Sequence, residues 1–102
     1  MTWLQVIIDK RFIRIDSEYS FSIEMWRDYK NKPSVWRDVQ IDTVRGRSYI
    51  NIQHQRWSVE RLVYKAHNPK WDILDNSKNN QIKFLNTYKG DCSIQNLEID
   101  VM

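Results

Sequence analysis

The sequence is poor in the residues that several common kinds of site require. In 102 residues it has one cysteine, two glycines and two prolines. The single cysteine, Cys92, can form no intramolecular disulfide, and its scarcity excludes zinc sites built on two or four cysteines. No histidine or lysine adjoins it in the sequence to activate it, so we expect an inert thiol. Two glycines also exclude the glycine-rich phosphate loops of P-loop and dinucleotide-binding proteins.

Long hydrophobic runs are also missing. Val6-Ile7-Ile8 is one of the longest apolar runs, whereas a membrane-spanning helix needs about 20 apolar residues. We therefore expect no membrane partner. The first residues show neither a basic leader nor a small-residue cleavage site. Together with the low cysteine content, this favours a cytoplasmic location, which is the host cytoplasm if a phage encodes the protein.

The composition is that of a small globular domain with a mild basic excess. Hydrophobic residues make up 41% of the chain and aromatic residues 13%, and 16 Lys and Arg against 13 Asp and Glu give a net charge of +3. The length predicts one domain over residues 1–102. Its first part, residues 1–43, is β-rich, and residues 44–102 form the second part. The charge permits a nucleic-acid partner but does not require one.

Alternating polar and apolar residues predict short antiparallel strands in the first half. Tyr19 to Met25 alternates most regularly, with Tyr19, Phe21, Ile23 and Met25 on one face. Residues 3–8 and 11–15 are predicted to pair around Asp9-Lys10. The meander continues in further strands at residues 39–44, 47–52 and 57–59.

The period then changes to that of a helix. Ser58 can cap a helix whose apolar residues Val59, Leu62, Val63 and Ala66 lie on one face. Asn68-Pro69 ends it. A strand at residues 82–85 and a short helix or turn at 93–98 follow. The predicted class is α+β, with an antiparallel β meander, then a helix, then a C-terminal unit of two strands and a helix.

Residues 44–99 resemble HNH-type homing endonucleases of phages and mobile introns. The resemblance rests on Arg45-Gly46-Arg47-Ser48-Tyr49, on Trp57 to Pro69 with its Arg61-Leu62-Val63 triplet, and on Ile82 to Glu98 with its Asn96-Leu97-Glu98 triplet. It implies a ββα unit around one divalent metal ion such as Mg²⁺. In that unit the histidine that ends the strand is the general base for phosphodiester hydrolysis.

Most of the residues that act as the general base or hold the metal ion in that family are replaced in this chain. Phe84 stands at the general-base position and cannot accept a proton, and Lys83 stands where an acidic residue often precedes the base. Asn96 is retained, and Asp91 is a tolerable metal ligand, so these two are the remaining metal candidates. Loss of a general base lowers a rate by about 10²- to 10⁴-fold. The resemblance therefore implies a catalytically inactive relative without a cofactor, and no catalytic residue is assigned.

A basic segment supplies the predicted binding site. Between residues 37 and 65 there are six basic residues against three acidic ones, and five of the six are arginines. Arginine pairs bidentately with phosphate and with guanine edges, and neighbouring aromatic rings can stack on bases. The predicted function is nucleic-acid binding, with DNA favoured over RNA, through Arg45, Arg47, Tyr49, Arg56, Trp57 and Arg61.

Two alternatives remain open. Trp, Tyr and Arg also dominate binding energy at protein interfaces, so the chain can equally be a phage protein that inhibits or modulates a host or competitor protein. The third hypothesis is a divergent metal-dependent nuclease that uses Asp91 or Asn96. If these aromatic residues form the core and the arginines a solvated face, the predicted site does not exist.

Overall fold

The computed structural model describes residues 2–17, 22–86 and 91–100. Within these residues nine strands form three antiparallel sheets, with one α-helix and two short 3-10 helices. Sheet A has the strand order β1-β2-β3-β4, sheet B has β5-β6-β7, and β8 pairs with β9. The bounds are β1 (Trp3–Ile8), β2 (Arg11–Asp16), β3 (Ile23–Arg27), β4 (Val35–Asp38), β5 (Asp42–Val44), β6 (Arg47–Ile52), β7 (Gln55–Ser58), α1 (Val59–His67), η1 (Lys78–Asn80), β8 (Gln81–Phe84), η2 (Ile94–Asn96) and β9 (Leu97–Asp100).

The predicted α+β class with a C-terminal ββα unit is wrong. The described residues are mostly β, and α1 precedes the β8–β9 hairpin instead of following it. Where the predicted unit required a second helix, the chain makes only the three-residue η2 and then forms β9. The chain turns at η2, so that Leu97 reaches the core and Leu97–Asp100 pairs with β8.

The predicted N-terminal meander is confirmed. β1 and β2 pair in register from Trp3↔Asp16 to Ile8↔Arg11. The three tight turns that link β1 to β2, β5 to β6 and β6 to β7 each contain two residues with positive φ: Asp9, Lys10, Arg45, Gly46, Gln53 and His54. Two-residue loops of this conformation match the right-handed twist of strands. Of the predicted strand 19–25, residues 19–21 lie outside the described residues.

Two strand predictions need correction in the middle of the chain. β4, at Val35–Asp38, was not predicted because Asn31-Lys32-Pro33-Ser34 interrupts the pattern. It pairs with β3 through Trp26↔Trp36. Of the predicted strand 39–44, only Asp42–Val44 pairs, as β5. Residues 39–41 instead connect sheet A to sheet B, with the Val39 N–H donating to the Ile23 carbonyl at 2.9 Å.

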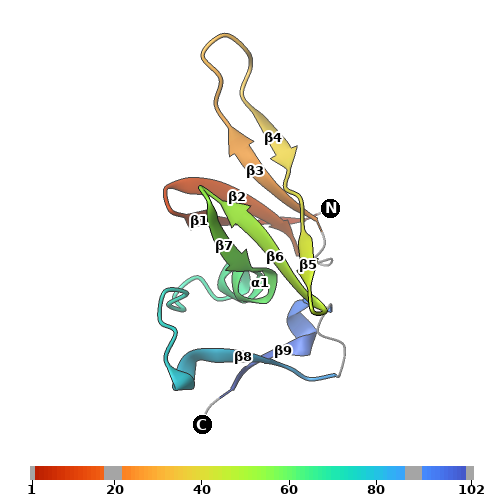
Figure 1. The fold of residues 1–102 in the computed structure, drawn as a ribbon. Coiled ribbons are helices and arrows are strands. Elements are labelled where there is room, and N and C mark those ends of the chain that lie inside the picture. Colours follow the sequence, from red (N-terminus) through yellow and green to blue (C-terminus); the bar gives the residue numbers. More distant parts are fainter. Residues whose placement is uncertain (1, 18–21, 87–90, 101–102) are drawn as a thin grey trace.

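One hydrophobic core joins the sheets to α1. Its buried members come from the inner faces of β1, β2, β3 and β6, from α1 and from the C-terminal part: Val6, Ile8, Ile13, Ile15, Ile23, Met25, Ile50, Ile52, Val59, Leu62, Val63, Ala66, Ile73, Cys92 and Leu97. The helix begins after Ser58 and its Val59, Leu62, Val63 and Ala66 are buried as predicted. Figure 1 shows the β3–β4 hairpin projecting beyond this core at one end of an elongated molecule of 50 × 26 × 23 Å.

Candidate nucleic-acid interface

The outer face of sheet B carries part of the predicted interface. In β6, Ser48, Ile50 and Ile52 are buried, so Arg47, Tyr49 and Asn51 alternate onto the opposite face. Arg56 of β7 is the cross-strand partner of Asn51 and shares this face. Its guanidinium carbon lies 5.0 Å from the centroid of the Tyr49 ring. The structure therefore brings Tyr49 and Arg56 together, with Arg56 inside β7 and not in the turn before the predicted strand 57–59.

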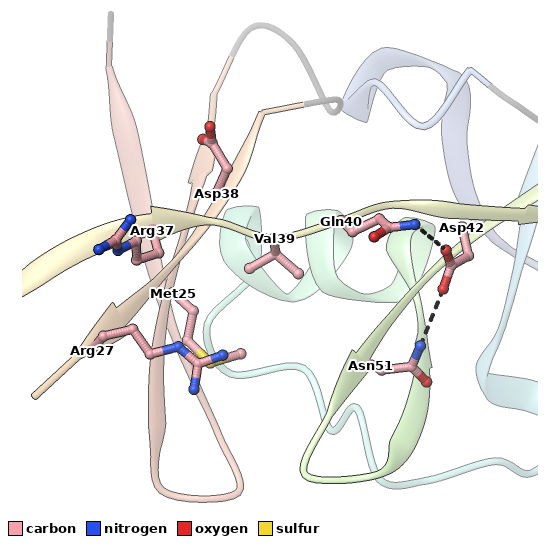
Figure 2. A pocket seen from close by; sticks show the side chains of 8 residues that line it. All are labelled: Met25, Arg27, Arg37, Asp38, Val39, Gln40, Asp42 and Asn51. Carbon is pink, nitrogen blue, oxygen red and sulfur yellow. Dashed lines mark hydrogen bonds between the residues drawn. The ribbon is translucent and has the colours of Figure 1, made fainter.

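A hollow of about 310 Å³ lies where the β3–β4 hairpin meets β5 and β6 (Figure 2). Arg27 and Arg37 line it because β3 and β4 continue past the core. Ile23 and Met25 are buried, and the next residue on the same face of β3 is the exposed Arg27. Arg37 is the cross-strand partner of Met25. The lining residues are Met25, Arg27, Arg37, Asp38, Val39, Gln40, Asp42 and Asn51.

A hydrogen-bonded triad forms one end of this hollow. The Asp42 carboxylate accepts from the Gln40 amide at 3.2 Å through Oδ1 and from the Asn51 amide at 3.1 Å through Oδ2. Figure 2 shows this triad on one side of Val39 and the two guanidinium groups of Arg27 and Arg37 on the other. The hollow thus presents cations at one end and a carboxylate held by two amides at the other.

A second hollow continues the first. It shares Met25, Arg27 and Asn51 with it and adds Arg11, Gln53 and His54. We call the two together the basic groove, defined by the lining residues of both. The groove carries three arginines, Arg11, Arg27 and Arg37, against the carboxylates of Asp38 and Asp42. Asn51 connects it to Arg56 and Tyr49 on the outer face of sheet B.

The groove contains residues that the sequence did not point to. Arg37 belongs to the predicted basic segment, but Arg11, Arg27 and Asn51 do not belong to the predicted interface. One signal in the sequence marks Arg27, since it continues the two-residue period of Ile23 and Met25 with a charged side chain. An arginine on an otherwise apolar strand face indicates that the face has left the core.

Arg61 and Trp57 do not reach the groove. Arg61 donates to the backbone carbonyls of Ile73 at 2.7 Å, Asp75 at 3.0 Å and Asn80 at 3.0 Å. Its guanidinium carbon also lies 4.7 Å from the centroid of the Trp71 ring. Arg61 therefore fastens the segment that follows α1. Trp57 pairs with buried Ile50 on the inner face and packs against the core.

Arg47 and Arg45 lie at the other end of β6. Arg47 is within 3.9 Å of the Glu60 carboxylate. Glu60 is only 4% exposed, and its Oε2 has no hydrogen-bond partner among the residues that the structure describes. Burial raises the pKa of this carboxyl group above its ordinary value, and the charge of Arg47 offsets part of that effect. Arg45 is exposed in the β5–β6 turn with φ of 53°.

The segment that resembles an HNH site forms a different arrangement. Phe84 is the cross-strand partner of Leu97 in the β8–β9 pair. The Asn96 side chain is buried, and it donates to the Asp91 carbonyl at 2.8 Å and accepts from the Asn86 N–H at 2.9 Å. Asp91 accepts from the Ser93 hydroxyl at 2.6 Å. Both remaining metal candidates are therefore engaged in hydrogen bonds that involve Asn86, Asp91 and Ser93.

Metal and thiol chemistry find little support in these contacts. Among residues 2–17, 22–86 and 91–100, the His, Cys, Asp and Glu side chains form no group of three that could hold a metal ion. Burial raises the pKa of the Cys92 thiol to about 12, and the nearby Glu60 carboxylate adds to the effect. Both the burial of Cys92 and this raised pKa disfavour the thiolate, which is the reactive form.

The outer face of sheet A is a second exposed surface. The Arg14 guanidinium carbon lies 4.4 Å from the centroid of the Trp3 ring and 4.6 Å from that of Trp36. Its Nε donates to Glu24 at 2.6 Å. Ile7 and Phe12, cross-strand neighbours on this face, are 61% and 44% exposed. This face therefore carries the exposed apolar pair Ile7 and Phe12 beside the half-buried rings of Trp3 and Trp36.

Comparison with models of known protein families, with curated proteins and with solved structures found no match to this chain. The described part of the chain contains no helix long and apolar enough to span a membrane.

Proposed function

We propose that the protein binds nucleic acid through the basic groove and the adjoining outer face of sheet B. The observation that supports this most is the position of Arg27 and Arg37, two exposed guanidinium groups that line one hollow beyond the end of the core. The planar guanidinium fork matches phosphate oxygens in a bidentate geometry. Arg11 and Arg56 extend the same surface on both sides of Asn51.

The polar groups of the groove fit such a ligand. The side chains of Gln40, Asn51 and Gln53 supply donors and acceptors beside the arginines. Tyr49 adds a ring on which a base can stack. The predicted contacts at Arg45 and Arg47 stay part of this proposal as additional phosphate contacts. Trp57 and Arg61 are left out because they serve the core and the loop.

Binding of labelled DNA and RNA oligonucleotides, measured by fluorescence anisotropy at low salt, tests this proposal. We expect the double variant Arg27→Gln/Arg37→Gln to bind at least about tenfold more weakly than wild type, because each lost phosphate contact removes counterion release. The control variant Lys70→Gln/Lys78→Gln removes the same charge from exposed positions outside the groove. Equal losses in the two variants would show that net charge alone drives binding and would contradict the proposal.

A protein partner is the second candidate, and the exposed pair Ile7 and Phe12 favours it. Exposed apolar residues that lie together on one face are typical of protein interfaces. Capture of a specific protein from nuclease-treated host lysate by wild type, with loss of capture in Phe12→Lys, would support this function. Capture that is retained by Phe12→Lys would exclude this face as the interface.

A further inference from the structure

The hollow in Figure 2 has two chemically different ends. Arg27 and Arg37 offer guanidinium donors at one end, and the Asp42 carboxylate forms an acceptor site at the other. Between them lie Val39, which is half-buried, and the buried Met25. With about 310 Å³, the hollow is at the small end of ligand pockets, which start at about 300 Å³. A ligand that fits both ends has an anionic group and a hydrogen-bond donor edge separated by an apolar body.

We propose that this hollow holds one guanine nucleotide unit, with its phosphate at Arg27 and Arg37 and the Watson–Crick edge of the base at Asp42. This inference rests on the proposed nucleic-acid binding and names the unit that the groove recognises. The orientation follows from charge, because the Asp42 carboxylate at one end repels phosphate while the two guanidinium groups at the other end attract it. The base then lies over the apolar surface of Val39 and Met25.

The preference for guanine follows from the donors of the four bases. Guanine carries two parallel N–H donors on its Watson–Crick edge, and a carboxylate accepts both through its two oxygens. Adenine and cytosine present one amino donor beside a ring nitrogen acceptor, which repels a carboxylate, and thymine or uracil presents one N–H between two carbonyl groups. Asp42 thus discriminates among them by hydrogen-bond complementarity.

Asp42 is fixed for this role and still has acceptor capacity. Gln40 and Asn51 each donate to a different oxygen of the carboxylate, which sets its plane. Each carboxylate oxygen can accept a second hydrogen bond, so two acceptor positions remain. The side-chain amides of Gln40 and Asn51 also present their own carbonyl oxygens as acceptors. Asp42 itself is half-buried, and its two amide partners are exposed.

The inference has a consequence for the form of the ligand. In a duplex the Watson–Crick edge of guanine is occupied by cytosine, so only an unpaired guanine can reach Asp42. Proteins that read this edge bind single strands, loops and ends. Free guanosine monophosphate presents the same phosphate and the same Watson–Crick edge. The experiment below distinguishes it from an unpaired guanine in a strand.

The test compares single-stranded eight-residue thymine oligonucleotides with one central guanine, inosine or adenine by fluorescence anisotropy. Wild type is expected to bind the guanine oligonucleotide about tenfold more tightly than the adenine one, with inosine between them because it lacks the 2-amino donor. Asp42→Asn is expected to reduce the preference to less than about twofold. The control Asp72→Asn removes the same charge from the exposed loop after α1 and is expected to keep the preference.

The outcomes separate this inference from the proposed function. Equal wild-type binding of the three oligonucleotides, or a guanine preference that survives Asp42→Asn, overturns the guanine subsite but leaves nucleic-acid binding intact. Absence of binding to every oligonucleotide and to guanosine monophosphate overturns both. Free guanosine monophosphate is also tested as a competitor of the oligonucleotide. If it displaces the oligonucleotide at the concentrations at which it saturates the protein by itself, the ligand is the free nucleotide. The wild-type comparison is decisive even if Asp42→Asn does not fold.

Discussion

The Asp42 carboxylate accepts a hydrogen bond from the side chain of Asn51, 3.1 Å away on the neighbouring strand. Asp42 stands directly opposite Tyr49, so Asn51 is its diagonal neighbour on the outer face of sheet B. This contact places a fixed acceptor inside a groove whose other charges are mainly cationic. The contact therefore links sheet B, whose strands the sequence predicted in part, to the basic groove, which no sequence pattern indicated.

Arg56 is expected to contribute to binding and little to folding. It is exposed, and its guanidinium carbon lies 5.0 Å from the centroid of the Tyr49 ring on the adjacent strand β6. Arg56→Ala should weaken oligonucleotide binding and lower the slope of log K against log salt by about 0.7 on a single strand. The free energy of unfolding, from urea titration followed by circular dichroism, should change by less than about 0.5 kcal/mol. Unchanged affinity would remove Arg56 from the interface.

Arg61 is expected to show the opposite behaviour. Its guanidinium group donates to three backbone carbonyls of the segment after α1. Arg61→Ala should lower the free energy of unfolding by about 2 kcal/mol, because these hydrogen bonds involve a charged donor. Arg61→Lys should recover only part of this loss, since one ammonium group cannot span the three acceptors. Oligonucleotide affinity of the folded variants should equal that of wild type, and a loss would return Arg61 to the interface.

We expect Glu60 to make the free energy of unfolding depend on pH. Burial raises the pKa of its carboxyl group in the folded state above the ordinary value of 4.5. The folded state therefore holds the proton more tightly, and the free energy of unfolding falls as the pH rises from 4.5 through the folded-state pKa. Glu60→Gln removes the buried charge, so its thermal midpoint at pH 7 should exceed that of wild type. The difference should shrink as the pH is lowered toward 4.5. A lower midpoint at pH 7 would mean that the Arg47 ion pair outweighs burial.

Two isoleucines in the first hairpin test the assignment of its faces. Ile13 is fully buried, whereas Ile7 is 61% exposed on the opposite face. Ile13→Ala should lower the free energy of unfolding by about 2–5 kcal/mol, the range for isoleucine truncation in a core. The same change at Ile7 should alter it by less than about 0.5 kcal/mol. Comparable losses at both positions, measured by urea denaturation, would show that a partner or a second layer covers Ile7.

The parts of the fold that the sequence predicts are those governed by local rules. The hairpin around Asp9-Lys10 and the helix after Ser58 follow from two-residue and helical periodicity. The β8–β9 pairing is set by tertiary contacts instead, because Asn96 and η2 turn the chain so that Leu97 reaches the core. The resemblance of two three-residue segments to the HNH family could not predict that turn.

The interface could be predicted only in part for the same reason. Tyr49 and Arg56 lie on neighbouring strands of one meander, so their proximity follows from pairing rules. Arg11, Arg27 and Arg37 lie on other strands, and they share a groove with Asn51 only because residues 39–41 carry sheet B alongside the β3–β4 hairpin. No spacing in the sequence specifies that placement. Arg61 was a candidate for binding because it is an arginine in the basic segment. The backbone carbonyls that it contacts come near it only in the folded chain, so the sequence did not indicate them.

The salt dependence of binding tests the central claim most directly. The dissociation constant for a single-stranded guanine-containing oligonucleotide is measured by anisotropy across a series of salt concentrations, for wild type and for Arg27→Gln/Arg37→Gln. If Arg11 and Arg56 each neutralise one phosphate and Arg27 and Arg37 together hold a third, log K should fall with log salt at a slope of about −2 in wild type and about −1.4 in the variant. A wild-type slope near zero, or the same slope in both proteins, would contradict a phosphate-binding groove.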